Sequence, residues 1–172
     1  MDSTRELSRR RPLVKGIMIL TFLSLCLTIC VTPAVSGDFT ARKPTDVEMA
    51  GITSTIDKVF KGWGNLDLDL YMSAWSVNAR QYLKNGVERD YYQILERRRQ
   101  DFQRYSQVKY YWEILDCDVE ANRAYVSCHY KMTFTKYDGG VIREDDEEFY
   151  VLEYTPDGFW FIIENYDYLL SR

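Results

Sequence analysis

The chain has 172 residues, of which 46% are hydrophobic and 15% aromatic, enough for one domain with a substantial core and too few for two. The formal net charge is -4, and residues 1–36 hold five basic and two acidic side chains, so the remainder is more acidic than the whole. An acidic domain is poorly suited to binding phosphates, and we expect no nucleic-acid partner.

Residues 1–36 have the pattern of an export signal. A basic stretch precedes the apolar run Ile17–Val31, and Ala34-Val35-Ser36 fits a cleavage site. The run is shorter than the ~18 or more residues of a spanning helix. We predict a cleavable signal peptide and a periplasmic or secreted domain. An uncleaved signal anchor, with the domain outside the membrane, is the alternative. Residues 37–45 are predicted to be a linker, and residues 46–172 a single domain.

Three amphipathic helices are predicted next, from apolar residues that recur every three or four positions. The first starts at Asp46 and ends at "GWGN". The second, "NLDLDLYMSAWS", is predicted to be capped by Asn65 and to run past Trp75. The third, "YYQILERRRQDFQRY", is capped by Asp90, with its three arginines mostly on the solvated face.

After Ser106 the period changes to that of strands. The segments "KYYWEILDCDVE", "AYVSCHYKMTFTKYD", "VIREDDEEFYVLEY" and "FWFIIENYDYLL" are separated by "ANR", "GG" and "TPDG" turns. An antiparallel meander is predicted, and with the helices the fold class is α+β.

The last strand is apolar on both of its faces, so both must be covered. If the turns have even lengths, Glu113, Tyr130, Trp160 and Glu164 lie on the face toward the helices. The opposite face is then too apolar to stay in water, and we expect a homodimer or another protein to cover it. The alternative cover is the linker or a longer helix. The predicted dimer face consists of Trp112, Tyr150, Phe161 and Ile163.

Three stretches together resemble the nuclear-transport-factor-2-like superfamily, which includes SnoaL-like and ketosteroid-isomerase-like proteins. They are "LDLDLYMSAWSVNA", "DVEANRAYV" and "TPDGFWFIIENY", in that order. Within that group the chain is most similar to the exported bacterial domains, and the export signal supports this choice. The resemblance implies a cone: three N-terminal helices packed on a curved antiparallel sheet of four or more strands. It further implies a pocket between helices and sheet, and pairing through the convex face.

The predicted pocket residues are Tyr71, Trp75, Glu113, Tyr130, Trp160 and Glu164. Isomerase-like members carry a carboxylate base just beyond the second helix, where this chain has Gln81, Tyr82 and Leu83. This departure argues against isomerase chemistry, and no catalytic residue is assigned. Two functions stay open. The first is a non-catalytic exported domain that binds a small apolar ligand or a cell-envelope protein. The second is a small SnoaL-like isomerase, dehydratase or cyclase that uses Glu113 or Glu164.

No cofactor or metal is predicted, because Cys117, Cys128 and an outward His129 make a poor zinc site. The acidic run Glu144–Glu148 is interpreted as a solvated strand edge. With Asn122-Arg123 as a hairpin loop, Cys117 lies opposite Cys128, and export to an oxidising compartment favours a structural disulfide between them. Two buried thiols are the alternative.

Overall fold

The computed structural model describes residues 40–167 of the chain. The expected signal segment, residues 1–36, lies outside these described residues, as do residues 37–39 and 168–172. The elements in chain order are α1 (Asp46–Asn65), α2 (Leu68–Met72), β1 (Trp75–Tyr82), β2 (Glu88–Asp90), α3 (Tyr91–Phe102), β3 (Tyr105–Glu120), β4 (Arg123–Lys136), β5 (Val141–Tyr154) and β6 (Trp160–Tyr166).

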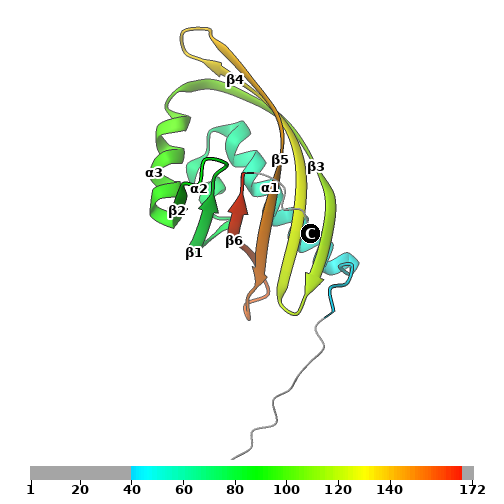
Figure 1. The fold of residues 1–172 in the computed structure, drawn as a ribbon. Coiled ribbons are helices and arrows are strands. Elements are labelled where there is room, and N and C mark those ends of the chain that lie inside the picture. Colours follow the sequence, from blue (N-terminus) through cyan, green and yellow to red (C-terminus); the bar gives the residue numbers. More distant parts are fainter. Residues whose placement is uncertain (1–39, 168–172) are drawn as a thin grey trace, which may run out of the picture. The chain divides into compact units, whose positions relative to one another are not determined.

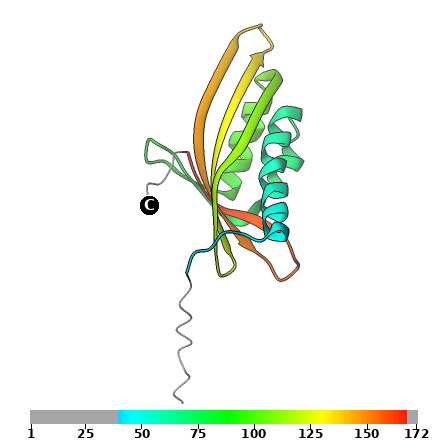
Figure 2. The ribbon, with the colours of Figure 1, turned by 90° about the vertical axis from the view of Figure 1, so that its right-hand side faces the viewer.

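The strands form one six-stranded sheet in the order β2-β1-β6-β5-β4-β3. β1 runs parallel to β6, and every other neighbouring pair is antiparallel. The long strands β3, β4 and β5 curve, and α1 and α3 lie on the same side of them (Figures 1 and 2). The predicted α+β class, with three helices on a curved sheet of four or more strands, is confirmed.

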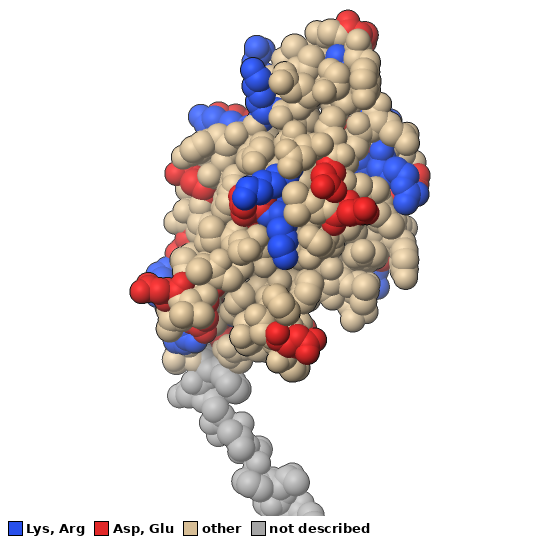
Figure 3. All heavy atoms as spheres, turned by 180° about the vertical axis from the view of Figure 1, so that it is seen from behind, with Lys and Arg blue, Asp and Glu red and all other residues tan. Residues whose placement is uncertain are grey.

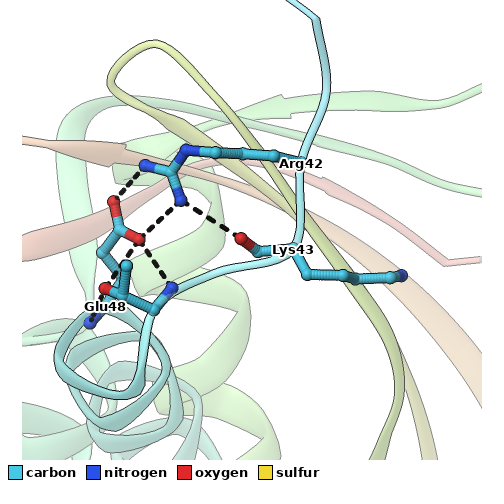
Figure 4. Close-up of polar contacts among 4 residues, drawn as sticks. Arg42, Lys43 and Glu48 are labelled. Atoms are coloured by element: carbon cyan, nitrogen blue, oxygen red, sulfur yellow. Dashed lines mark hydrogen bonds and ion pairs between the residues drawn. The ribbon is translucent and has the colours of Figure 1, made fainter.

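Polar contacts from the preceding segment hold the start of α1 (Figure 4). The backbone N–H of Thr45, the N-cap, donates to the Glu48 carboxylate at 2.8 Å. Arg42 donates to both oxygens of that carboxylate at 2.7 and 2.8 Å, and these bonds, with those from Thr45, lower the pKa of Glu48 to about 2. Arg42 also forms a β-bridge with Val119, so the entry to α1 is fastened to the end of β3.

The first and third predicted helices form where the sequence indicated. Asp90 caps α3 and accepts a hydrogen bond from the backbone of Gln93, whose side chain accepts one from the backbone of Asp90. The second predicted helix is wrong in extent. α2 spans five residues after the N-cap Asp67, and Trp75 already belongs to β1. Pairing of β1 with β6 places Trp75 opposite Ile162, and this tertiary contact overrides the local helical pattern.

Two β-bulges reverse which side chains face the helices. In β3, Ile114 pairs with Cys128 and Asp116 with Ser127, so Leu115 is an extra residue. In β6, Ile162 pairs with Leu152 and Glu164 with Val151, which leaves Ile163 as the extra residue. Alternation of side chains therefore restarts within each of these two strands.

The loop between β4 and β5 also departs from the expected geometry. Thr135 pairs with Val141, so five residues, an odd number, lie between the members of this last pair. The residues of β5 that face the helices are therefore Tyr150 and Leu152, not Phe149 and Val151 as an even loop predicts. Every second residue toward the start of the strand shares this inward face, including three acidic side chains, Glu144, Asp146 and Glu148.

The core lies between α1 and the sheet. Ile52 and Ile56 of α1 are completely buried, and so are Val126 and Cys128 of β4. Within residues 40–167, no helix has the length and apolar character needed to cross a membrane. On the face seen in Figure 3, basic and acidic side chains lie in small groups among uncharged surface.

Candidate functional site

A cavity of about 650 Å³ opens between the helices and the inner face of the sheet. α1, α2 and α3 contribute side chains to it, and so do the strands β1, β4, β5 and β6. Its floor is aromatic, whereas its walls are polar and charged. The sequence predicted a small apolar pocket. In the structure the apolar character is confined to the floor of the cavity.

Trp63 of α1 organises the aromatic floor. Its ring makes edge-to-face contacts with Tyr71 and Phe134, with ring centroids 6.3 and 5.3 Å apart. Phe60, one helical turn earlier, lies 5.9 Å from Tyr130 of β4. Such a floor suits a flat or alicyclic apolar group.

A chain of hydrogen bonds crosses the wall formed by β1, β6 and β5. The side-chain amide of Gln81 donates to Asn165 Oδ1 at 2.9 Å, and Asn165 Nδ2 donates to Glu148 Oε2 at 3.3 Å. The hydroxyl of Tyr150 donates to the same Glu148 oxygen. Both of these donors reach Oε2, and no described residue donates to Glu148 Oε1.

Glu148 is the group on this wall best suited to exchange a proton. Burial raises its pKa to about 7, although the hydrogen bonds from Tyr150 and Asn165 act in the opposite direction. Burial also raises the pKa of Glu144 and of Asp167 on the same side of the cavity. A carboxyl group with a pKa near neutrality can act as acid or base at physiological pH.

Basic side chains line the side of the cavity formed by β1, β2 and α3. They are Lys84, Arg89, Arg97 and Arg98. Lys84 forms an ion pair with Asp146, and Arg97 and Arg98 share Asp101. The cavity therefore has a mainly basic side and a mainly acidic side. Arg98 is only 12% exposed, contrary to the expectation that the arginines of this helix are solvated.

Of the six predicted pocket residues, Tyr71 and Tyr130 line the cavity. Trp75 and Trp160 are buried behind it: Trp75 packs on Tyr71, with ring centroids 5.7 Å apart, and Trp160 packs against Gly51 of α1.

Glu113 and Glu164 are not pocket residues, and their prediction is wrong. The bulges at Leu115 and Ile163 place both on the outer face of the sheet. There Glu113 accepts a hydrogen bond from His129, and Glu164 accepts one from Tyr166.

The predicted dimer face is also divided between the two sides of the sheet. Trp112 stacks on Phe60 of α1 with ring centroids 5.2 Å apart, and Tyr150 is 1% exposed beside Glu148. Both therefore face the helices, which corrects their assignment to the outer face. Phe161 and Ile163 do lie on the outer side of β6, where each is half-buried.

The predicted register of the two cysteines is wrong. The hairpin loop is Ala121-Asn122, so Cys117 pairs with Val126, and Cys128 is displaced to the diagonal position. Both are buried, as expected for the core face, and both are free thiols. The alternative of two buried thiols describes the structure.

His129 points outward, as expected, between two carboxylates. Its ring nitrogens lie 3.2 Å from Glu113 and 2.7 Å from Asp145, and these hydrogen bonds raise the pKa of the imidazole. Among residues 40–167, no three histidine, cysteine, aspartate or glutamate side chains are grouped so as to hold a metal ion.

The sequence interpretation missed Glu148, Tyr150, Asn165 and Gln81 as site residues. The available signal was alternation: Glu144, Asp146 and Glu148 fall in step with the apolar residues Tyr150 and Leu152. A strand with acids in register with core residues places carboxylates at the edge of a core. Nothing in the sequence marks Asn165, because a bulge turns it inward.

No protein-family model and no curated protein matches this sequence. Solved structures do match. A conserved protein from Planctomyces limnophilus is similar with a TM-score of 0.68 and 12% identity over 73% of this chain and 98% of that chain. A nuclear transport factor 2-like superfamily protein from Salmonella enterica serovar Typhimurium matches with a TM-score of 0.62 and 20% identity over 70% and 88%.

A hexachlorocyclohexane dehydrochlorinase also matches, with a TM-score of 0.61 and 12% identity over 69% of this chain and 82% of that chain. At such low identities these likenesses establish the fold alone. The chain has the nuclear-transport-factor-2-like fold, and proteins with this fold include enzymes as well as proteins of unknown function.

Proposed function

We propose that this protein binds a small organic molecule in the cavity between its helices and its sheet. The observation that carries the proposal is the combination of volume and lining. A cavity of about 650 Å³ lies within the range of about 300 to 1,000 Å³ typical of ligand sites. Protein interiors are otherwise close-packed, so a space of this size is not a packing defect.

The residues that line the cavity indicate which chemical groups the ligand carries. The ring system of Phe60, Trp63 and Tyr71 would cover an apolar body, and Glu148 Oε1 would bind a polar group of the ligand. Glu148, Asn165 and Gln81 are already hydrogen-bonded to one another, so the wall is ordered before a ligand arrives.

A thermal-shift screen of small aromatic and alicyclic compounds against the purified protein tests this proposal. Ligands of the cavity should raise the melting temperature, and Glu148→Gln should change that shift. Glu147→Gln is the matched control, because Glu147 follows the opposite parity and lies across from the outward His129. A shift that is altered equally by both variants would contradict binding in the cavity.

A second candidate function is a proton-transfer enzyme of the SnoaL-like type, favoured by the raised pKa of Glu148. The deprotonated carboxylate would remove a proton from a carbon acid lying on the aromatic floor. In the neighbouring dehydrochlorinase the same fold carries an elimination enzyme. That likeness establishes no activity for this chain.

Ring opening of nitrobenzisoxazole is a direct probe of such a base. In that reaction a carboxylate removes the ring C–H proton, the N–O bond breaks, and a coloured cyanophenolate forms. Wild-type protein should accelerate it with a rate that rises through about pH 7. Glu148→Gln should abolish the acceleration and Glu147→Gln should retain it. Equal rates in all three proteins would leave binding alone as the function.

We also propose that the domain acts outside the cytoplasm, because of the basic stretch, apolar run and small-residue site in residues 1–36. Expression with the native leader should yield protein that begins near Gly37, found by N-terminal sequencing. Recovery of intact chain in the membrane fraction would instead support a signal anchor.

A further inference from the structure

Three arginines meet at the basic side of the cavity, and the topology explains why. Arg89 is in β2, which passes directly into α3 through the N-cap Asp90. Arg97 and Arg98 lie about two helical turns later on α3 and also line the cavity. A short strand and the helix that follows it therefore bring three guanidinium groups to one corner.

Arg98 is held in a fixed position within this corner. Its guanidinium carbon lies 4.1 Å from the ring centroid of Trp63 and 4.8 Å from that of Tyr71. Its Nη2 donates to the Tyr71 hydroxyl at 3.2 Å and its Nη1 to Asp101 at 3.4 Å. Its Nε is buried and has no hydrogen-bond partner among the described residues. A buried donor without an acceptor is costly, unless a ligand supplies one.

Among the described residues, Asp101 is the one carboxylate that forms ion pairs with the arginines of this corner. Asp101 is shared by Arg97 at 3.2 Å, Arg98 at 3.4 Å and Arg104 at 3.8 Å. Arg89 donates to the neutral side chain of Gln81 at 3.1 Å and forms no ion pair with any described carboxylate. Burial lowers the pKa of Arg89, and the charges of Arg97 and Arg98 lower it further.

The acids across the cavity do not contact the arginines directly. Burial raises the pKa of Glu144 and Glu148, and the charge of Arg98 is close enough to lower it in part. Asp146 is paired with Lys84. No ion pair within residues 40–167 joins Glu144, Glu148 or Asp167 to Arg89, Arg97 or Arg98. In a protein that is acidic as a whole, this corner therefore holds guanidinium N–H donors that no described carboxylate accepts from, and a ligand anion could accept from them.

We propose that Arg89 and Arg98 bind the anionic group of a small organic acid, whose apolar body lies along the aromatic floor toward Glu148. Guanidinium groups bind carboxylates and phosphates through paired N–H donors. Arg98 Nε lacks an acceptor and Arg89 lacks a carboxylate partner among the described residues, and both side chains line the cavity. This proposal rests on the proposed function, since it names the class of ligand for the same cavity.

Isothermal titration calorimetry at low ionic strength with three phenyl compounds tests the proposal. Hydrocinnamate carries a carboxylate, hydrocinnamamide is its neutral counterpart, and phenyl phosphate carries the other common anion. Hydrocinnamate should bind about tenfold or more tightly than the amide, since hydrogen bonds to charged groups are worth that much. Stronger binding of phenyl phosphate would assign the site to phosphate esters instead of carboxylates.

Arg89→Met should remove most of the preference for the anion, measured as the ratio of the hydrocinnamate affinity to the hydrocinnamamide affinity. Arg99→Met is the matched control, because Arg99 follows Arg98 on α3 but pairs with Glu96 at the surface. Should Arg89→Met fail to fold, titrations of the wild type with added salt provide the second measurement. Salt should weaken the binding of hydrocinnamate but not the binding of the amide. Equal affinities for acid and amide would overturn the anion site and preserve the binding cavity. Binding of none of the three would overturn both.

Discussion

The carboxylate of Glu148 accepts a hydrogen bond from the hydroxyl of Tyr150, two residues further along the same strand. Residues two apart in a strand point to the same face, so the pair projects together into the cavity. The bond favours the charged carboxylate, yet burial outweighs it and raises the pKa of Glu148 to about 7. The protonation of this site therefore changes within the physiological range.

This relationship predicts how stability depends on pH. The folded-state pKa of Glu148 lies above its ordinary value of 4.5, so its contribution to stability is complete below that value and is lost as pH rises through about 7. The free energy of unfolding of the wild type should therefore fall by about 2–3 kcal/mol between about pH 5 and pH 8 on account of this group.

Glu148→Gln should remove that part of the pH dependence, as measured by urea denaturation at the two pH values. Glu144 and Asp167, whose pKa values are also raised, will retain a smaller slope of the same sign. Glu147→Gln should keep the wild-type slope. Parallel slopes in wild type and Glu148→Gln would show that Glu148 has an ordinary pKa.

The second prediction concerns Trp112 and Phe161, which the sequence analysis placed on one face of the sheet and the structure places on opposite faces. Trp112 stacks on Phe60, so Trp112→Ala should lower the free energy of unfolding by about 2–3 kcal/mol. Phe161 lies on the outer face, so Phe161→Glu should fold normally. If the outer face forms a homodimer, as the sequence led us to expect, Phe161→Glu should also sediment as a monomer. A wild type that is monomeric at high micromolar concentration would contradict the dimer.

The third prediction concerns the two thiols of the domain. Cys117 and Cys128 are buried, and burial raises both pKa values, that of Cys117 to about 11. About one Cys117 in a thousand is then a thiolate at pH 8, so the native protein should react slowly with iodoacetamide. After unfolding without reductant, peptide mass spectrometry should find both cysteines alkylated. If the two cysteine peptides are instead found unmodified and linked to each other, the predicted disulfide forms after all.

The fourth prediction concerns the close approach of α1 to α2. A Cβ atom on Gly62 would lie 2.7 Å from the backbone nitrogen and Cα of Tyr71, which cannot move without displacing the cavity floor. Gly62→Ala should cost about 1–3 kcal/mol, despite the better helix propensity of alanine. Gly64→Ala is the control, because its Cβ would meet only the partly exposed ring of Tyr110, which can swing away. Equal melting temperatures for the two variants would contradict this account.

The sequence was a good guide to α1 and α3, because each has a capping residue and a regular apolar stripe that no distant contact opposes. β1 was missed because Tyr71 to Trp75 also fits a helix, and only its pairing with β6 decides between the two. Fold class, helix order and the inward face of β4 could therefore be predicted from local pattern.

The candidate site could not be predicted to the same extent. Its residues depend on loop parity and on bulges, which a single missing or added residue changes. Glu148 was hidden in an acidic run that reads as solvated surface, and Arg98 in a row of three arginines whose outer members are exposed. In both cases one member of a charged run turns inward, and composition does not distinguish it from its neighbours.

The bulge at Leu115 has a consequence for which mutations this domain tolerates during evolution. It separates β3 into two stretches in which the alternation of inward and outward side chains is set independently. Val108 to Ile114 lie beside α1, and Cys117 to Val119 lie beside the segment at Arg42 that leads into α1. Deleting one residue there would force a choice between burying Trp112 and Ile114 or burying Cys117 and Val119. A single-codon deletion at this point would thus act on the whole strand, whereas most substitutions along it act only where they occur.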